Sequence, residues 1–180
     1  SVIITGANKL RTINGFQKLK YIDESLDIFS AYLEEINGFQ SLTEIAGLKN
    51  QEVDTTQWIN FQFQAHKVKS VKDFSNLRKV RGMWVNRNHE LTDFSGFDNI
   101  DTSYLRYIVL KDNEKLALCN SKFLCSYLEN PKHEAKIFSN APGCNTREEI
   151  LASCTTGTDE RHTTITENGV YPNPCTLNTT

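Results

Sequence analysis

The sequence predicts a mainly β fold in which short parallel strands stack as a solenoid, closed at its C-terminal end by helices. Two observations predict it: a hydrophobic repeat with a period near 23 residues, and a short alternating strand ahead of each copy. The 180 residues fit one ordinary domain, since domains mostly contain ~50–250 residues. We expect the solenoid and its cap over residues 1–154, a linker over 155–168 and a separate segment over 169–180.

The charge balance excludes several classes of partner. Twenty Lys and Arg against twenty-two Asp and Glu give a formal net charge of −2. Nucleic acids and anionic membranes attract strongly basic proteins, so neither partner is expected. No run approaches the ~18 apolar residues of a membrane-spanning helix, so insertion into a membrane is not expected either.

Four segments in the first two thirds of the chain carry the repeat in register. Successive copies are 23, 35 and 23 residues apart, so the middle interval holds one repeat and a twelve-residue insertion within residues 46–57. The polarity of this insertion favours a surface loop. The four hydrophobic columns are Leu10, Leu33, Val68 and Leu91; Ile13, Ile36, Val71 and Phe94; Phe16, Phe39, Phe74 and Phe97; and Leu19, Leu42, Leu77 and Ile100.

A glycine precedes the phenylalanine in three of the four copies, at Gly15, Gly38 and Gly96. Asp73 takes its place in the third copy. Glycine at a fixed place indicates a backbone with positive φ, which Asp tolerates better than most residues. We therefore expect a left-handed residue at this position of each copy.

A short strand is expected ahead of each copy, with alternate residues facing the core. Runs of β-branched and aromatic residues favour strands over helices. In a solenoid these strands stack beside one another in parallel. The inward residues are Val2 and Ile4, Leu26 and Ile28, Phe61 and Phe63, Met83 and Val85, and Ile108 and Leu110.

The residues between them face outward and form one continuous sheet surface. This surface mixes aromatic, amide and charged side chains, which suits recognition of a protein or a sugar. The alternative is that Phe29, Trp84 and Phe138 are covered by the insertion, the tail or a neighbouring domain. The candidate ligand-binding residues are Asp27, Phe29, Asn60, Gln62, Trp84, Asn86 and Lys111.

A first cap helix is expected after residue 120. Asn120 or Ser121 can cap it, and Asn130 followed by Pro131 ends it. An open solenoid end exposes apolar core and strand edges, so a helix with one apolar face would cover it. That face consists of Phe123, Leu124, Tyr127 and Leu128.

A last strand and a second helix follow. Ala135 and Ile137 have the spacing of inward strand residues. Asn145 followed three residues later by Glu148 predicts a capping box at the start of a helix that carries Ile150, Leu151 and Cys154.

The repeat LxxIxGFxxLxxI resembles the receptor L-domain, the leucine-rich-repeat-like right-handed parallel β-helix of insulin and epidermal growth factor receptor ectodomains. Residues 107–154 resemble the version in secreted Bacteroidetes proteins: an Asn-rich turn, a Cys, a short helix with a second Cys, a strand ending in NAxGCN, and a helix ending in Cys. The resemblance covers roughly residues 1–154. It implies a β-helix that binds ligands on its broad sheet face.

Four of the five cysteines belong to this cap, and four cysteines allow three pairings. Cys119 and Cys144 each follow a strand of successive coils, while Cys125 and Cys154 each lie on a cap helix, which favours bridges within these two pairs. Reduced, buried thiols are the alternative; zinc is disfavoured because no CxxC or close Cys/His pair occurs. Disulfides would place the protein in an oxidising compartment, either secreted or on the bacterial surface.

No motif predicts catalysis, a metal or a cofactor. His89-Glu90 and His133-Glu134 begin like a metalloprotease helix, but neither has the second histidine of that motif. His66 and His162 have no evident partners, so all four histidines are interpreted as surface residues. P-loop, GxGxxG and GxSxG motifs are absent, and no pair of acidic residues is spaced for glycoside hydrolysis.

The tail has two parts. Residues 155–168 are polar and have a linker composition. The run from Val170 to Pro174, VYPNP, resembles the opening of the C-terminal sorting domain that directs Bacteroidetes proteins through type IX secretion; the family's domain would need more strands after Thr180. Cys175 lies in this segment without an obvious partner, so it is either free or joins two chains as a dimer.

Together these features lead us to expect a secreted or cell-surface recognition or adhesion module rather than an enzyme. Its ligand would be a protein or a glycan. Two alternatives remain from other classes: a structural spacer domain of a larger surface protein, and a β-helix enzyme that acts on polysaccharide.

Overall fold

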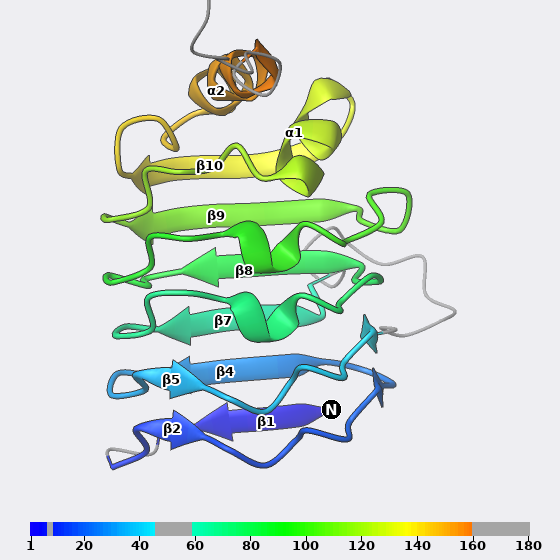
Figure 1. Ribbon diagram of the computed structural model, residues 1–180, viewed down its shortest axis with the longest axis vertical. Coiled ribbons are helices and arrows are strands. Elements are labelled where there is room, and N and C mark those ends of the chain that lie inside the picture. The colour runs from blue at the N-terminus through cyan, green and yellow to red at the C-terminus, as the bar shows by residue number, and fades with distance from the viewer. Residues whose placement is uncertain (7–8, 46–58, 160–180) are drawn as a thin grey trace, which may run out of the picture.

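The computed structural model describes residues 1–6, 9–45 and 59–159. Its main element is a six-stranded parallel sheet with the order β1-β4-β7-β8-β9-β10 (Figure 1). Strands equivalent in the repeat are therefore neighbours in the sheet, as predicted. The predicted insertion at 46–57, His162 and the segment 169–180 with Cys175 lie outside the described residues. The strands are Val2–Thr5 (β1), Leu26–Ser30 (β4), Phe61–Ala65 (β7), Gly82–Asn86 (β8), Tyr107–Asn113 (β9) and Glu134–Asn140 (β10).

The register of this sheet confirms the predicted inward residues. All of them are buried or pack against the buried core. Because the same row of the ladder continues across the 35-residue interval, the extra residues do not shift the register of the repeat. One inward row consists of Val2, Leu26, Phe61, Met83, Ile108 and Ala135.

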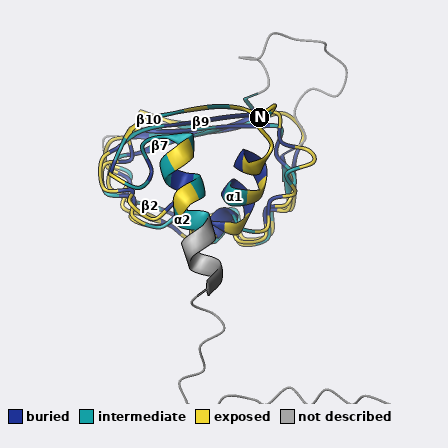
Figure 2. Cartoon of the chain, turned by 90° about the horizontal axis from the view of Figure 1, so that it is seen from above, coloured by how far each residue is buried: buried dark blue, intermediate teal, exposed yellow. Residues whose placement is uncertain are grey.

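Two smaller ladders that the sequence did not predict lie beyond the main sheet. Thr12–Ile13 (β2) pairs with Glu35–Ile36 (β5), and Tyr21–Ile22 (β3) pairs with Glu44–Ile45 (β6), both in parallel. Seen from above, the main sheet forms one long side of a flattened outline and β2 lies on the opposite side (Figure 2). The third and fourth copies instead carry short 3₁₀-helices, Lys72–Phe74 and Ser95–Phe97.

The phenylalanine column forms a stack through the core. Ring centroids are 5.0 Å apart between Phe16 and Phe39, 5.4 Å between Phe39 and Phe74, and 5.6 Å between Phe74 and Phe97. The last three side chains are fully buried. Offset stacking of this kind stabilises beyond the apolar area it buries, so the column holds successive copies in register.

The prediction of positive φ in the glycine column is wrong, because no glycine of the column has it. The column instead faces the backbone of the preceding copy. A Cβ on Gly96 would lie 1.9 Å from the Val71 carbonyl oxygen, and one on Gly38 would lie 3.2 Å from the Phe16 nitrogen. Glycine is therefore required for close approach between copies rather than for a left-handed turn.

Positive φ occurs instead where three strands of the main sheet end, before a ladder of asparagines. Asn113 Oδ1 accepts hydrogen bonds from Asn88 N (3.1 Å) and Asn88 Nδ2 (3.0 Å), and Asn140 Oδ1 accepts from Asn113 N (3.2 Å) and Asn113 Nδ2 (2.9 Å). The ladder satisfies turn groups that would otherwise be buried without partners. The residues with positive φ, between 53° and 56°, are Arg87, Asp112 and Ser139.

The first cap helix, Lys122–Glu129 (α1), confirms the predicted apolar face, whose four residues are all buried. Ser121 is the N-cap residue, but its hydroxyl makes no capping hydrogen bond. The backbone N–H of Lys122 donates instead to Asp98 Oδ1 at 2.8 Å. A carboxylate from the fourth copy thus caps a helix of the C-terminal end.

The second cap helix, Arg147–Asp159 (α2), begins one residue later than the predicted capping box requires. Thr146 Oγ1 accepts from the Glu149 N–H at 3.2 Å, and Glu149 Oε2 accepts from the N–H groups of Asn145 (3.0 Å) and Gly143 (2.8 Å). The pair predicted at Asn145 and Glu148 is therefore wrong by one position. Residues 155–159, predicted as linker, belong to this helix.

Both helices lie at the β10 end of the stack (Figure 1), where two disulfides hold them. Cys119 bonds to Cys144 and Cys125 to Cys154, the predicted pairing. The first bridge joins the segments before α1 and before α2, and the second joins the two helices directly. Among the described residues, no helix is long and apolar enough to cross a membrane.

Candidate functional site

The outer face of the main sheet brings most of the predicted ligand-binding residues together. Neither described helix covers this face (Figure 2). Because equivalent residues are neighbours across the strands, the outward side chains form rows. The first row consists of Ile3, Asp27, Gln62, Trp84, Val109 and Lys136. The second row includes Thr5, Phe29 and Gln64 on the first three strands and Asn86, Lys111 and Phe138 on the last three.

The exposure of these side chains varies along the rows. Ile3 and Phe138, at the two ends of the sheet, are 64% and 44% exposed. Phe29, Trp84 and Gln62 in the middle are half-buried. The centre of the face therefore presents partly exposed aromatic side chains together with an amide.

Two predicted members of the site are not available on this face. Asn60 precedes β7 and is buried; its Nδ2 donates to Ile45 O (2.6 Å), while its Oδ1 accepts from Arg81 N (3.0 Å) and Gly82 N (3.2 Å). Its side chain therefore connects two other backbone segments, because Asn60 lies in the segment before β7, where the alternation of the strand does not apply. Asn86 has an outward position in the row, but its side chain is buried too.

Two polar atoms of the first row are buried without a hydrogen bond, namely Asp27 Oδ1 and Trp84 Nε1. Gln62 lies between these two residues in the ladder. The other oxygen of Asp27 accepts from the Ser25 hydroxyl at 2.9 Å. An unpaired buried polar group costs about 1–3 kcal/mol, and such costs are tolerated chiefly at functional sites.

Cations lie over aromatic rings at the end of the face nearest the cap. Lys111 Nζ is 5.4 Å from the centroid of the Phe138 ring and 3.3 Å from Asp112 Oδ2. Lys136 Nζ is 5.9 Å from the Tyr107 centroid. This end of the face is therefore both aromatic and positively charged, whereas the middle is aromatic and carries Asp27.

The interpretation of His66 as a residue without partners is wrong. Its ring packs edge-on against His89 at 4.8 Å, and His89 Nδ1 lies 2.6 Å from Glu114 Oε2. Burial lowers the pKa of His66, and the charges of His89 and Arg87 lower it further. The signal for this pair was their separation of 23 residues, one period of the repeat. In the described part of the chain, no three metal-ligating side chains come together.

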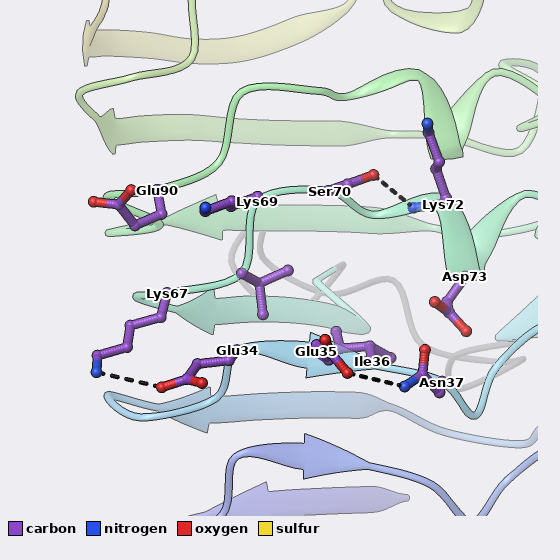
Figure 3. A pocket seen from close by; sticks show the side chains of 11 residues that line it. Glu34, Glu35, Ile36, Asn37, Lys67, Lys69, Ser70, Lys72, Asp73 and Glu90 are labelled. Carbon is purple, nitrogen blue, oxygen red and sulfur yellow. Dashed lines mark hydrogen bonds and ion pairs between the residues drawn. The ribbon is translucent and has the colours of Figure 1, made fainter.

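A groove that the sequence did not predict lies on the β5 side of the molecule, between the second and third copies of the repeat (Figure 3). Its volume is about 730 Å³. Charged side chains of both signs line it, and no aromatic residue does. The lining residues are Glu34, Glu35, Ile36, Asn37, Lys67, Val68, Lys69, Ser70, Lys72, Asp73 and Glu90.

The outer sheet face and the groove are the two candidate binding surfaces considered among the described residues. Both are built from residues that the repeat places on neighbouring coils. Compared with known proteins, the chain matches no family model, no curated protein and no solved structure.

Proposed function

We propose that the protein is a secreted or cell-surface recognition module that binds a protein or a glycan on the outer face of its main sheet. We further propose that the stacked copies form a short right-handed parallel β-helix of the receptor L-domain type. The three parallel ladders and the phenylalanine stack support this architecture.

One observation carries the binding proposal: the described helices leave the sheet face open, and this face holds aromatic side chains on three alternate strands, β4, β8 and β10. Phe29 and Trp84 are half-buried and Phe138 is exposed. Rigid aromatic side chains supply contact area at low entropic cost, which makes them frequent anchors of recognition surfaces.

The proposed location rests on the two disulfides. Structural disulfides persist in oxidising compartments and are rare in the reducing cytosol. The pairs Cys119–Cys144 and Cys125–Cys154 both staple the C-terminal end of the stack. This arrangement is compatible with an extracellular protein.

The test is capture by the variant Phe29→Ala/Trp84→Ala. A glycan array and a panel of extracellular proteins are probed first with the wild-type protein. Any ligand of the sheet face should lose at least about tenfold in affinity in the double variant, since aromatic anchors carry much of the energy of an interface.

Tyr21→Ala is the matched control, because Tyr21 is 42% exposed but lies on β3, away from the main sheet. It should bind as the wild type does. Circular dichroism and thermal unfolding verify that both variants are folded. Unchanged capture by the folded double variant would overturn the proposal, as would equal loss in the Tyr21 variant.

A further inference from the structure

The groove lies where one of the ladders between copies is interrupted. Between the second and third copies, β4 pairs with β7 on one side, and Glu44 forms a bridge with Lys79 on another. On the third side, β5 has no such partner: in the described part of the chain, no backbone hydrogen bond joins residues 34–37 with residues 68–72. Pairing resumes between the third and fourth copies, where Ser70 bridges Asp93.

The interruption leaves main-chain groups facing the groove. The N–H groups of Glu35 and Asn37 donate to the first copy, at Arg11 O (3.1 Å) and Ile13 O (2.8 Å). Because successive residues of an extended chain point their peptide groups to opposite sides, the N–H and C=O of Ile36 face the groove. The same alternation applies to the opposite wall. Lys69 O accepts from Thr92 N in the fourth copy (3.1 Å), so the N–H and C=O of the next residue, Ser70, face the groove.

Asp73 lies between the second and third copies. It occupies the column in which Gly38 and Gly96 allow close approach to the preceding copy. Figure 3 shows its side chain pointing from the 3₁₀-helix toward the segment that carries Asn37. Its Oδ1 is buried and makes no hydrogen bond. Hydrogen bonds with the Gly38 and Phe39 backbone and the Gln40 side chain tie this carboxylate to the second copy. Asp73 therefore places a side chain between the two copies at the position where Gly96 has none.

The walls differ in charge. Glu34 and Glu35 lie on the β5 wall, whereas Lys67, Lys69 and Lys72 lie on the other wall together with Asp73 and Glu90. Lys67 Nζ reaches across one end of the groove to Glu34 Oε1 at 3.5 Å. The absence of aromatic side chains among the lining residues disfavours a sugar, for which aromatic rings are the usual platform. Facing peptide groups and mixed charges favour a polypeptide.

We propose that this groove binds an extended peptide segment of another protein, which continues the interrupted ladder through main-chain hydrogen bonds to Ile36 and Ser70. Addition of a strand to an exposed edge is an established mode of peptide recognition. The peptide carries both an acidic and a basic side chain, the acidic one toward Lys69 and the basic one toward Glu35. This site is separate from the outer sheet face and does not depend on it.

The test selects random heptapeptides displayed on phage against the wild-type protein, with the variant Asp73→Gly present in solution as competitor. The competitor removes peptides that bind elsewhere, because its groove is expected to close. Selected peptides should shift the backbone amide resonances of Ile36 and Ser70. They should bind Asp73→Gly at least about tenfold more weakly, and N-methylation of alternate peptide nitrogens should abolish binding.

Three further variants make the outcome decisive. Asp73→Asn keeps the volume of the side chain and should retain binding, whereas Lys69→Glu should weaken peptides with an acidic residue; Phe29→Ala/Trp84→Ala should bind the peptides normally. If Asp73→Gly does not fold, the Lys69 variant and the N-methylated peptides carry the test. Failure to select any peptide that distinguishes the variants, shifts confined to the sheet face, or oligosaccharide binding at these amides would overturn the proposal.

Discussion

At the scale of single residues, the glycine column shows that close packing between copies determines which substitutions each position tolerates. Gly15, Gly38 and Gly96 have the same place in the repeat, but their surroundings differ. A Cβ on Gly15 would meet nothing within 4 Å. Sequence identity in a column therefore does not imply equal tolerance to substitution.

We predict that Gly96→Ala destabilises the protein by about 3 kcal/mol, because overpacking against a rigid backbone costs about 1–3 kcal/mol and more where nothing can shift. The new Cβ would lie 1.9 Å from the Val71 carbonyl oxygen. Gly15→Ala is the matched control and should change the free energy of unfolding by less than about 0.5 kcal/mol. Urea unfolding measures both, and equal effects would contradict close approach as the reason for the column.

The charge of Asp73 gives a prediction about pH. Burial raises the pKa of its carboxyl above the ordinary value of 3.8, although Gly38, Phe39 and Gln40 oppose the shift by hydrogen bonding. A raised pKa means that the folded state binds the proton more tightly. The protonated carboxyl of Asp73 therefore contributes to the free energy of unfolding of the wild type below pH 3.8. This contribution is lost as the pH rises through the higher pKa of the folded state.

Asp73→Asn removes this titration while keeping the shape of the side chain. The variant should be more stable than the wild type at pH 7, and its advantage should shrink as the pH falls toward 3.8. Urea unfolding at a series of pH values measures the difference in free energy between the two proteins. A difference that is independent of pH would show that the charge of Asp73 is not what the folded state disfavours.

At the scale of elements, the strands of the main sheet were predictable and the shorter ladders were not. Alternation over four or more residues identified β1, β4, β7, β8 and β9, because one face of each is in the core. The strands β2, β3, β5 and β6 have two residues each, too few to show a period. The asparagine ladder depends on contacts between residues about one repeat apart, which a local pattern cannot reveal.

We predict that Asn113→Ala destabilises the protein by about 2–4 kcal/mol, because it leaves several buried groups without partners. Asn113 is fully buried; its side chain accepts from Asn88 and donates to Asn140 Oδ1 and to Val85 O (3.2 Å). Asn99→Ala is the control, since Asn99 is exposed and makes one bond, to Ser75 O. A loss for Asn113→Ala no larger than that of the control would contradict the structural role of the ladder.

At the scale of the whole molecule, the repeat predicted the architecture better than the surface. The spacing of the copies was enough to place the main sheet, the inward rows and the order of the strands. The site was predicted only in part, because burial of Asn60 and Asn86 depends on the turns around them. The groove lies where the repeat departs from its pattern, at the 35-residue interval and at Asp73, and a one-dimensional pattern does not show how the neighbouring copies pack there.

The cap closes one end of a stack whose copies contact mainly their neighbours. Weakening the cap should therefore destabilise the adjacent end of the stack before it destabilises the whole molecule. Cys125→Ser/Cys154→Ser removes the bridge between α1 and α2, and loss of a disulfide typically costs about 2–4 kcal/mol. Hydrogen exchange should accelerate first in α2, while the central strands β4 and β7 keep their protection until global unfolding. If exchange accelerates equally in α2 and in these strands, the stack and its cap unfold as one cooperative unit, and the bridge stabilises the whole molecule rather than its end.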